Sequence, residues 1–396
     1  MAVSADIFHR AIYANQLAEQ LLDPQPLLQN VRSGVFLSGI RRVGKTTFLR
    51  QDLIPALEAR GAIVIYVDLW ADRTKSPAVL VHQAVGETFR QLANPGSGLL
   101  KRFKGLNLGA AGFSFGFQFD SIGTTTGTTL AQAFEELVAK AKVDVVLIID
   151  EVQQTLSSEE GYGLLHALKA ARDAVNSKPG TPGHFLFLGT GSHKSLVTDM
   201  ATRRSQPFTG AVSAAYALLG KDFVQWQLER IAAAPGATRL PTLEVAWQGF
   251  QAVGHRPEEL FKALVQLQGM DMPPDQAFPV ICATLASAAA DVELHAIEEF
   301  GELGKALFGR IASGSEQGIT GLFSADALTA YGHQTGATVE ASQVQTLADK
   351  MIAANLITRP GHGIYMVADP FVRNVWLQRG RLALRVLVAR DSSTEE

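Results

Sequence analysis

Residues 39–46 constrain the fold of this chain more than any other segment. They read GIRRVGKT and fit the pattern G-x-x-x-x-G-K-[ST]. This segment follows a short apolar run, residues 35–38, and precedes a helical pattern that begins at Lys45. Glycines in such a loop let successive backbone N–H groups turn toward an anion, and the start of the helix adds positive potential. The segment therefore predicts a phosphate-binding loop between a strand and a helix.

The residues of this loop have distinct expected roles. Lys45 can reach the β and γ phosphates of a nucleotide, the Thr46 hydroxyl can ligate Mg²⁺, and Thr47 can donate to a phosphate nearer the nucleoside. The residues expected to bind the nucleotide are Gly39, Arg42, Val43, Gly44, Lys45, Thr46 and Thr47. A chance glycine-rich turn with an exposed lysine is the alternative, and the flanking strand and helix argue against it.

Two adjacent acids, Asp150 and Glu151, end a second buried run at residues 145–149. In an open parallel sheet, ligands bind at the carboxyl ends of the strands. We therefore expect Asp150 to hold magnesium, directly or through water, and Glu151 to orient and deprotonate an attacking water. An Asp-Glu pair alone is also compatible with a solvated turn, but the phosphate loop favours the catalytic interpretation.

The apolar runs predict an α/β fold with a mainly parallel, doubly wound sheet. The expected strands are residues 35–38, 62–67, 143–149 and 184–188, and a helix is expected over 162–175. Residues 105–127 interrupt this pattern, with phenylalanines at every second position from Phe113 to Phe119. Period two indicates one face of a strand. We expect a β-hairpin on the core there, with an exposed aromatic loop that grips a partner as the alternative.

After about residue 215 the sequence changes to Ala- and Leu-rich helical patterns. Amphipathic segments at 306–311, 325–331 and 344–356 are followed by a strand, turn and strand over 358–367, which is typical of a winged helix. The expected organisation is a lead-in (1–33), an α/β core (34–215), a helical domain (216–300), a winged helix (301–380) and a polar tail (381–396).

The composition excludes several classes of partner. Thirty-five Lys and Arg against 38 Asp and Glu give a net charge of −3, so no overall field draws the chain to nucleic acid or to an anionic membrane. The most apolar run is far shorter than the roughly 20 residues that span a bilayer. A single cysteine, Cys282, cannot form an internal disulfide. We expect a cytoplasmic protein without a membrane partner.

Three segments together, GIRRVGKTTFL, VVLIIDEVQ and HFLFLGTGS, resemble the AAA+/STAND-type P-loop ATPases, especially the archaeal-ATPase-like group related to replication-origin initiators. The later segments RRSQPFTGA, GHRPEEL and GIYMVADPFVRNVWL are similar in kind, so the resemblance spans most of the chain. It implies a P-loop NTPase core, a helical lid and a winged helix. It also implies ATP with Mg²⁺ as ligands, and hydrolysis coupled to assembly or conformational change.

The resemblance implies further site residues. A polar residue on the strand that lies between the loop strand and the acid strand senses the γ-phosphate in this family, and Thr190 or Ser192 matches that position. Capping of the following helix is the alternative. Arg256 matches a lid residue that touches nucleotide, with a salt bridge at the start of a helix as the alternative.

Arg203 or Arg204 could be a finger that reaches the γ-phosphate of a neighbouring subunit in a homo-oligomer. The alternative is a solvated basic turn. The family often has Gly-Arg after its Pro-aromatic segment, whereas this chain has Gly210 and Ala211. The motif therefore does not establish that an arginine acts in trans.

The third helix of the expected winged helix, residues 341–351, carries one lysine and one aspartate, and only Gln343 and Gln345 could read base edges. A basic patch near the hairpin would comprise Arg359, His362, Arg373, Arg379, Arg381 and Arg385. We expect an ATPase that acts as a switch on an unidentified protein partner. The alternatives are a nucleotide-gated DNA-binding protein and a nucleotide-binding scaffold with negligible turnover.

Overall fold

The computed structural model describes residues 7–72, 74–94, 96–98, 113–123, 127–236, 238–315, 317–361 and 363–380. The chain divides into two compact units, Met1–Ala217 and Leu218–Glu396. The division lies two residues from the expected end of the α/β core, although it does not test the finer domain boundaries. Residues 381–396, expected as a polar tail, lie outside the described residues.

The first unit is built on a five-stranded sheet with the order β2-β3-β4-β1-β5, in which all neighbouring strands are parallel. The strands are β1 (Val35–Ser38), β2 (Ile63–Asp68), β3 (Val145–Asp150), β4 (Phe185–Gly191) and β5 (Val212–Ala215). The register pairs Ser38 with Gly191 and Asp68 with Asp150, so the polar strand ends meet at one edge. The expected α/β fold with a parallel sheet is confirmed.

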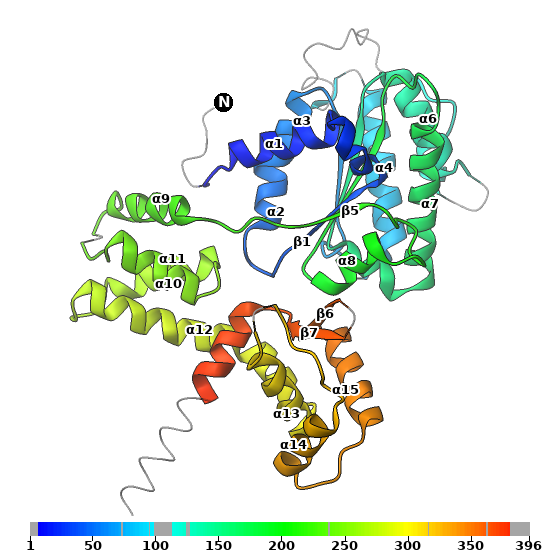
Figure 1. The fold of residues 1–396 in the computed structure, drawn as a ribbon. Coiled ribbons are helices and arrows are strands. Elements are labelled where there is room, and N and C mark those ends of the chain that lie inside the picture. The colour runs from blue at the N-terminus through cyan, green and yellow to red at the C-terminus, as the bar shows by residue number, and fades with distance from the viewer. Residues whose placement is uncertain are drawn as a thin grey trace, which may run out of the picture. The chain divides into compact units, whose positions relative to one another are not determined.

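Helices cover both faces of this sheet (Figure 1). Their bounds are α1 (Ala11–Leu22), α2 (Lys45–Phe48), α3 (Ile54–Ala59), α4 (Pro77–Ala93), α6 (Leu130–Ala141), α7 (Glu159–Asn176) and α8 (Lys194–Thr202), with short 3₁₀ or π turns at Pro26–Ser33, Leu49–Leu53, Phe119–Ser121 and Val152–Ser157. Alternate strand residues enter two cores. Val145 and Leu147 pack with α4, α6 and α7, whereas Val146 and Ile148 pack with α1 and α3. Within the expected lead-in of residues 1–33, α1 packs on one face of the sheet.

The expected hairpin in 105–127 is absent from the part of this segment that the structure describes, because 113–123 contain a short 3₁₀ turn and no strand. Its four phenylalanines, Phe113, Phe115, Phe117 and Phe119, nevertheless pack on the core. The ring centroid of Phe89 on α4 lies 4.6 Å from that of Phe115 and 5.4 Å from that of Phe117. The alternation thus reflects burial of one side of an irregular segment.

The second unit begins with helices and ends with a hairpin. The helices are α9 (Lys221–Ala232), α10 (Leu243–Ala252), α11 (Pro257–Leu267), α12 (Pro274–Glu298), α13 (Gly301–Ala312), α14 (Ala325–Thr335) and α15 (Ala341–Ala353). The strands β6 (Ile357–Gly361) and β7 (Ile364–Val367) pair antiparallel, and residues 370–380 are helical. Ile319 adds an antiparallel bridge to Tyr365 on β7. Within the described ranges, no helix has the length and apolar character needed to cross a bilayer.

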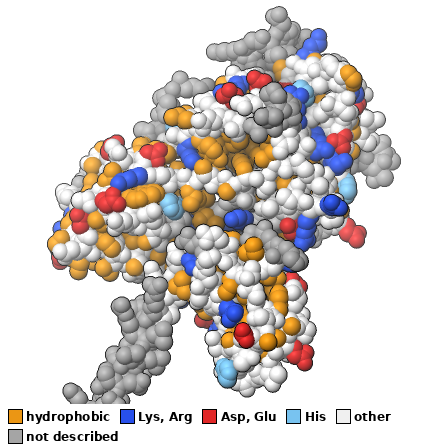
Figure 2. Space-filling model, viewed as in Figure 1, with side chains coloured by type: hydrophobic (Ala, Val, Ile, Leu, Met, Phe, Trp, Pro, Cys, Tyr) orange, Lys and Arg blue, Asp and Glu red, His pale blue; other side chains and the backbone are white. Residues whose placement is uncertain are grey.

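One core joins the second half of α12 to the C-terminal elements, because Ala290, Leu294 and Ile297 pack with Phe308, Tyr331 and Met351. On the face drawn in Figure 2, Lys and Arg side chains are interspersed with Asp and Glu on both units. This distribution agrees with the small net charge of −3.

Candidate active site

The phosphate loop lies where the sequence predicts it, between the end of β1 at Ser38 and the start of α2 at Lys45. Gly44 has a φ of 88° and Arg42 a φ of 65°, so two loop residues are in the left-handed region. A Cβ on Gly39 would lie 2.9 Å from the Cβ of Tyr216 and 3.2 Å from the Cδ of Lys45. Gly39 is therefore required for close packing at the loop entrance, and Gly44 for the turn into the helix.

The Lys45 side chain folds back over this loop. Its Nζ donates to the carbonyl oxygens of Gly39 at 2.8 Å and Ile40 at 3.0 Å, and the residue is 8% exposed. Burial lowers the pKa of Lys45 below its usual 10.5, and the carboxylates of Glu151 and Asp150 oppose this shift. The alternative interpretation, in which Lys45 is an exposed lysine, is excluded because its ammonium group is held inside the loop.

Asp150, at the end of β3, is 1% exposed and accepts hydrogen bonds from four donors. The Thr46 hydroxyl donates to Oδ2 at 2.6 Å, and the Thr190 hydroxyl donates to Oδ1 at 2.5 Å. The Tyr66 hydroxyl donates to Oδ2 at 3.2 Å, and the Glu151 amide donates to Oδ1 at 3.1 Å. The loop threonine and the strand-end acid are thus in direct contact, as the two motifs predict.

Tyr66 is a site residue that the sequence does not reveal. It lies on β2, two residues before Asp68, and the guanidinium carbon of Arg50 lies 4.8 Å from its ring centroid. Burial, together with the negative charge of Asp150, raises the pKa of Tyr66 well above its usual value. The hydroxyl is therefore a neutral donor to Asp150. A tyrosine inside an apolar strand has no signature that separates it from a core residue.

Glu151 follows Asp150 in a left-handed conformation with a φ of 58°, which turns its side chain away from the strand. Three donors converge on its Oε2 atom: the Gln153 amide at 2.5 Å, the Ser192 hydroxyl at 2.8 Å and the Ser192 backbone N–H at 3.2 Å. Gln153 is a second site residue that the sequence does not reveal. A Cβ on Gly191 would lie 2.0 Å from Gln153 Oε1, so this glycine makes room for the amide.

The two candidate sensors lie on the strand that the resemblance implies, because β4 pairs with both β1 and β3. Thr190 contacts Asp150 and Ser192 contacts Glu151. The alternative that they cap the following helix is not supported, since the N-cap of α8 is His193. The Arg41 Nε also donates to the Ser192 hydroxyl at 3.4 Å. Contact of either sensor with a γ-phosphate stays a prediction.

The remaining predicted residues make other contacts. Arg203 is exposed and forms an ion pair with Asp199 at 3.2 Å, and Arg204 is exposed. Arg256, in the second unit, is 3% exposed and its Nη2 donates to Asp369 at 2.9 Å. The salt-bridge alternative for Arg256 is thus observed, while its contact with nucleotide and the arginine finger both stay predictions.

Part of the expected basic patch is engaged within the second unit. Arg373 donates to the carbonyl oxygens of Ala312 and Gly314, at 2.7 and 2.6 Å, and Arg379 forms an ion pair with Asp291. Of the other members, Arg359 is exposed, and His362, Arg381 and Arg385 lie outside the described residues. Arg373 and Arg379 are thus engaged by the protein itself, and the basic patch stays a prediction.

Comparisons with known proteins bear on the fold and on the domain type. Residues 29–196 match the family model described as an AAA domain. The Walker-type ATPase paby2304 of Pyrococcus abyssi is similar in structure, with 19% identity, a TM-score of 0.59, and coverage of 94% of this chain and 96% of that one. No curated protein matches the sequence.

The ORC2 protein of Aeropyrum pernix is also similar in structure. Its ADP form has 13% identity, a TM-score of 0.53, and coverage of 95% of this chain and 96% of that one. Its ADPNP-ADP complexes have 15% identity, a TM-score of 0.50 and the same coverage, 95% and 96%. At these identities the likeness is one of fold. The chain thus matches an AAA domain over residues 29–196 and shares its fold with these two archaeal proteins.

Proposed function

We propose that the protein binds ATP with Mg²⁺, hydrolyses it, and uses the cycle as a switch that acts on a protein partner. The observation that carries this proposal is the 2.6 Å hydrogen bond from the Thr46 hydroxyl to Asp150, two residues 104 positions apart in sequence. It supports a single site at which the helix start and the strand-end acid meet. The resemblance supports adenine as the base.

Lys45 supplies the positive charge for the phosphates. In the structure its ammonium is bonded to two loop carbonyls, which are neutral acceptors. Phosphate oxygens are charged acceptors and make shorter, stronger hydrogen bonds with an ammonium group. We therefore expect Lys45 to exchange a carbonyl for a phosphate oxygen when ATP enters. The loop amides from Gly39 to Thr47 and the positive end of the helix would hold the remaining phosphate charge.

The residues present fit a magnesium ion. Mg²⁺ prefers hard oxygen ligands, and a hydroxyl and a carboxylate stand together here in Thr46 and Asp150. When bound, the ion would offset the negative charge of the phosphate oxygens. Thr190, Tyr66 and the Glu151 amide each donate to Asp150 and fix the orientation of its carboxylate. Asp150 is thus a positioned ligand rather than a mobile surface acid.

Glu151 is the proposed general base. Gln153 and Ser192 both donate to Oε2 of Glu151. None of the described residues donates to Oε1. We assign Oε1 to the attacking water. As the water oxygen bonds to the γ-phosphorus, its proton passes to Glu151 and the bond to the β–γ bridging oxygen breaks. The products are ADP and inorganic phosphate. Ser192 also links Glu151 to the Arg41 side chain beside the phosphate loop.

For the rest of the chain we propose a helical lid over 216–300 and a winged helix over 301–380. The order of three helices, α13, α14 and α15, followed by the β6–β7 hairpin supports the winged helix, as does the bridge between Ile319 and Tyr365. Arg203 and Arg204 are exposed and therefore available to a neighbouring subunit in a homo-oligomer.

A protein partner is better supported than DNA. The Gln343 side chain accepts a hydrogen bond from the Glu340 backbone at 2.9 Å, and the Gln345 amide donates to Asp349 at 3.0 Å. Both candidate base-reading amides of α15 are thus engaged locally. A duplex titration at increasing salt separates the two functions. DNA binding by phosphate contacts would weaken steeply with salt, whereas we expect weak binding even at low salt.

The test of hydrolysis is a phosphate-release assay on the full chain with the variants Glu151→Gln and Glu19→Gln, the second being an exposed glutamate on α1. We expect Glu151→Gln to bind nucleotide and to lose turnover by about 100-fold or more. Glu19→Gln should behave as the wild type, and chelation of Mg²⁺ should stop release. Equal turnover in Glu151→Gln and wild type would refute the base. Wild-type release no higher than in Lys45→Ala would instead indicate a scaffold.

A further inference from the structure

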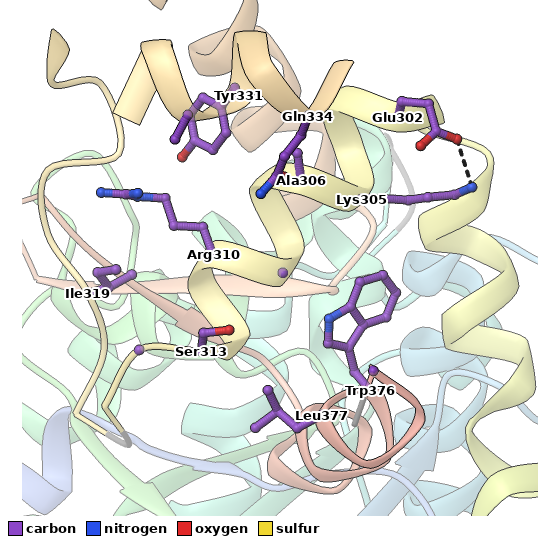
Figure 3. Close-up of a pocket in the computed structure, with 14 residues that line it drawn as sticks. Glu302, Lys305, Ala306, Arg310, Ser313, Ile319, Tyr331, Gln334, Trp376 and Leu377 are labelled. Carbon is purple, nitrogen blue, oxygen red and sulfur yellow. Dashed lines mark hydrogen bonds and ion pairs between the residues drawn. The ribbon is translucent and has the colours of Figure 1, made fainter. Parts of the chain in front are cut away.

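A pocket of about 760 Å³ lies in the second unit, between α13, α14 and the helical residues 370–380 (Figure 3). Its volume is within the range of about 300 to 1,000 Å³ that small-molecule sites occupy. Nothing in the nucleotide site described above uses it, because its lining comes entirely from residues 302–380.

One end of the pocket is polar. The Arg310 side chain from α13 and the Tyr331 ring from α14 lie together there, with the guanidinium carbon 5.9 Å from the ring centroid, and the Tyr331 hydroxyl points toward the Arg310 side (Figure 3). Tyr331 is 1% exposed. Among the described residues, neither its hydroxyl nor the Arg310 Nε has a hydrogen-bond partner, although both atoms are buried. Buried polar groups are nearly always paired, so this end lacks an acceptor.

The charge at this end is not balanced by the protein. Lys305, the other cation of the lining, is paired with Glu302 at 3.0 Å. Arg310 has no carboxylate within ion-pair distance in the part of the chain that the structure describes. The lining thus carries one uncompensated positive charge. Burial raises the pKa of Tyr331 to about 12, so its hydroxyl is a neutral donor at physiological pH. One positive charge and one neutral hydroxyl donor together suit a ligand group that carries a single negative charge and accepts hydrogen bonds.

The other end is apolar. Trp376 and Leu377, from the helical residues 370–380, face α13, whereas Ile319 lies on the same side of the pocket as Arg310 (Figure 3). The Trp376 ring is fixed edge-on by Phe308, with centroids 5.1 Å apart. It lies close to the backbone of α13, because a Cβ on Gly309 would be only 3.6 Å from its Nε1. A Trp376 ring held in place beside the glycine backbone of α13 offers an apolar surface on which a flat apolar group can pack.

We propose that this pocket binds a small carboxylic acid with an aromatic or otherwise apolar body. Its carboxylate pairs with the Arg310 guanidinium, which presents a planar fork of donors matched to a carboxylate. The apolar body lies against Trp376 and Leu377. This site is independent of the proposed ATPase cycle.

The test uses 2-naphthoate as the probe and its neutral isostere 2-naphthamide as the matched ligand, each titrated into the full chain by isothermal calorimetry. A ligand of this size is expected to bind with a Kd of about 1 mM. We expect the carboxylate to bind the wild type about tenfold more tightly than the amide, since only the carboxylate gains the charged hydrogen bonds.

Two variants locate the interaction. Arg310→Gln should reduce the affinity for naphthoate about tenfold and leave that for naphthamide unchanged. Arg230→Gln, on α9 and outside the pocket, should leave both unchanged. Lys45→Ala should also bind naphthoate as the wild type does, which separates this site from the nucleotide site.

The wild-type comparison does not depend on how Arg310→Gln folds. No binding of naphthoate by the wild type, or equal binding of naphthoate and naphthamide, would overturn the proposal. So would unchanged naphthoate binding in a folded Arg310→Gln variant.

Discussion

The strand-end site of the first unit and the pocket of the second unit differ in how their charged groups are paired, although the buried Gln153 Oε1 of the first site also has no partner among the described residues. At the strand end, Asp150 accepts from four donors and Lys45 donates to two carbonyls. In the pocket, the Tyr331 hydroxyl and the Arg310 Nε have no partner among the described residues.

This difference has an energetic consequence. A ligand at the strand end must replace hydrogen bonds that the protein already makes, so the gain comes from exchanging neutral acceptors for charged ones. A ligand in the pocket would supply bonds that the protein does not make at all. The first site is therefore ordered before it binds, and the second is completed by binding.

The largest expected effect is that of Lys45→Ala on nucleotide affinity. This variant removes the charged donor to the phosphates, and we expect affinity for a fluorescent ATP analogue with Mg²⁺ to fall by about 100-fold or more. Lys169→Ala, which removes an ammonium paired with Asp173 on α7, is the matched control and should bind as the wild type does. Affinity within about threefold of wild type in Lys45→Ala would place the phosphates elsewhere.

A smaller effect is expected at Thr190. Thr190→Ala removes the hydroxyl that donates to Asp150, whereas Thr190→Ser keeps it. We expect ATP turnover to fall about tenfold in the alanine variant and less than about threefold in the serine variant. Steady-state phosphate release measures both. An equal loss in the two variants would show that the methyl group, and thus packing, is what matters at this position.

Two Tyr→Phe variants compare the sites directly. Tyr66→Phe removes a hydroxyl bonded to Asp150, so we expect the free energy of unfolding to fall by about 1 kcal/mol. Tyr331→Phe removes a buried hydroxyl with no partner in the described chain, so we expect that free energy to stay the same or rise by up to about 1 kcal/mol. Urea unfolding of each variant measures the change. The same loss in both would contradict the contrast between the two sites.

The smallest effect concerns pH. Burial lowers the pKa of Lys45 in the free protein, and a bound phosphate favours the charged ammonium and so raises that pKa. ATP affinity should therefore be level below the lowered pKa and decline as the pH rises from there toward 10.5. Lys45→Arg keeps its charge in this range and should lack the decline. An identical pH profile for the two proteins would exclude Lys45 as the titrating group.

The nucleotide site could be predicted from the sequence because consecutive residues carry it. The loop at 39–46 and the pair Asp150 and Glu151 are recognisable without knowing what lies beside them. Tyr66 and Gln153 could not be predicted, because only the sheet register and the turn after β3 bring their side chains to the two acids. The sequence does not indicate strand β5, because this strand is only four residues long and ends in two alanines.

The phenylalanines at 113–119 show where a pattern misleads. Period two indicates a strand only when another strand is available for pairing. Here the rings of Phe115, Phe117 and Phe119 pack on Phe89 of α4, and the described residues 113–123 contain no strand. The pocket of the second unit shows the opposite limit. Arg310, Tyr331 and Trp376 are far apart in sequence and share no motif, so only the packing of α13, α14 and residues 370–380 reveals their proximity.

The central claim is that a triphosphate and its metal lie between Lys45 and Asp150. The most direct test is a crystal structure of the full-length Glu151→Gln variant with ATP and Mg²⁺. We predict phosphate density within hydrogen-bond distance of Lys45 Nζ, and a metal ion between Thr46 Oγ1 and Asp150. Nucleotide bound away from the loop, or a loop without phosphate density at saturating ATP, would contradict the account.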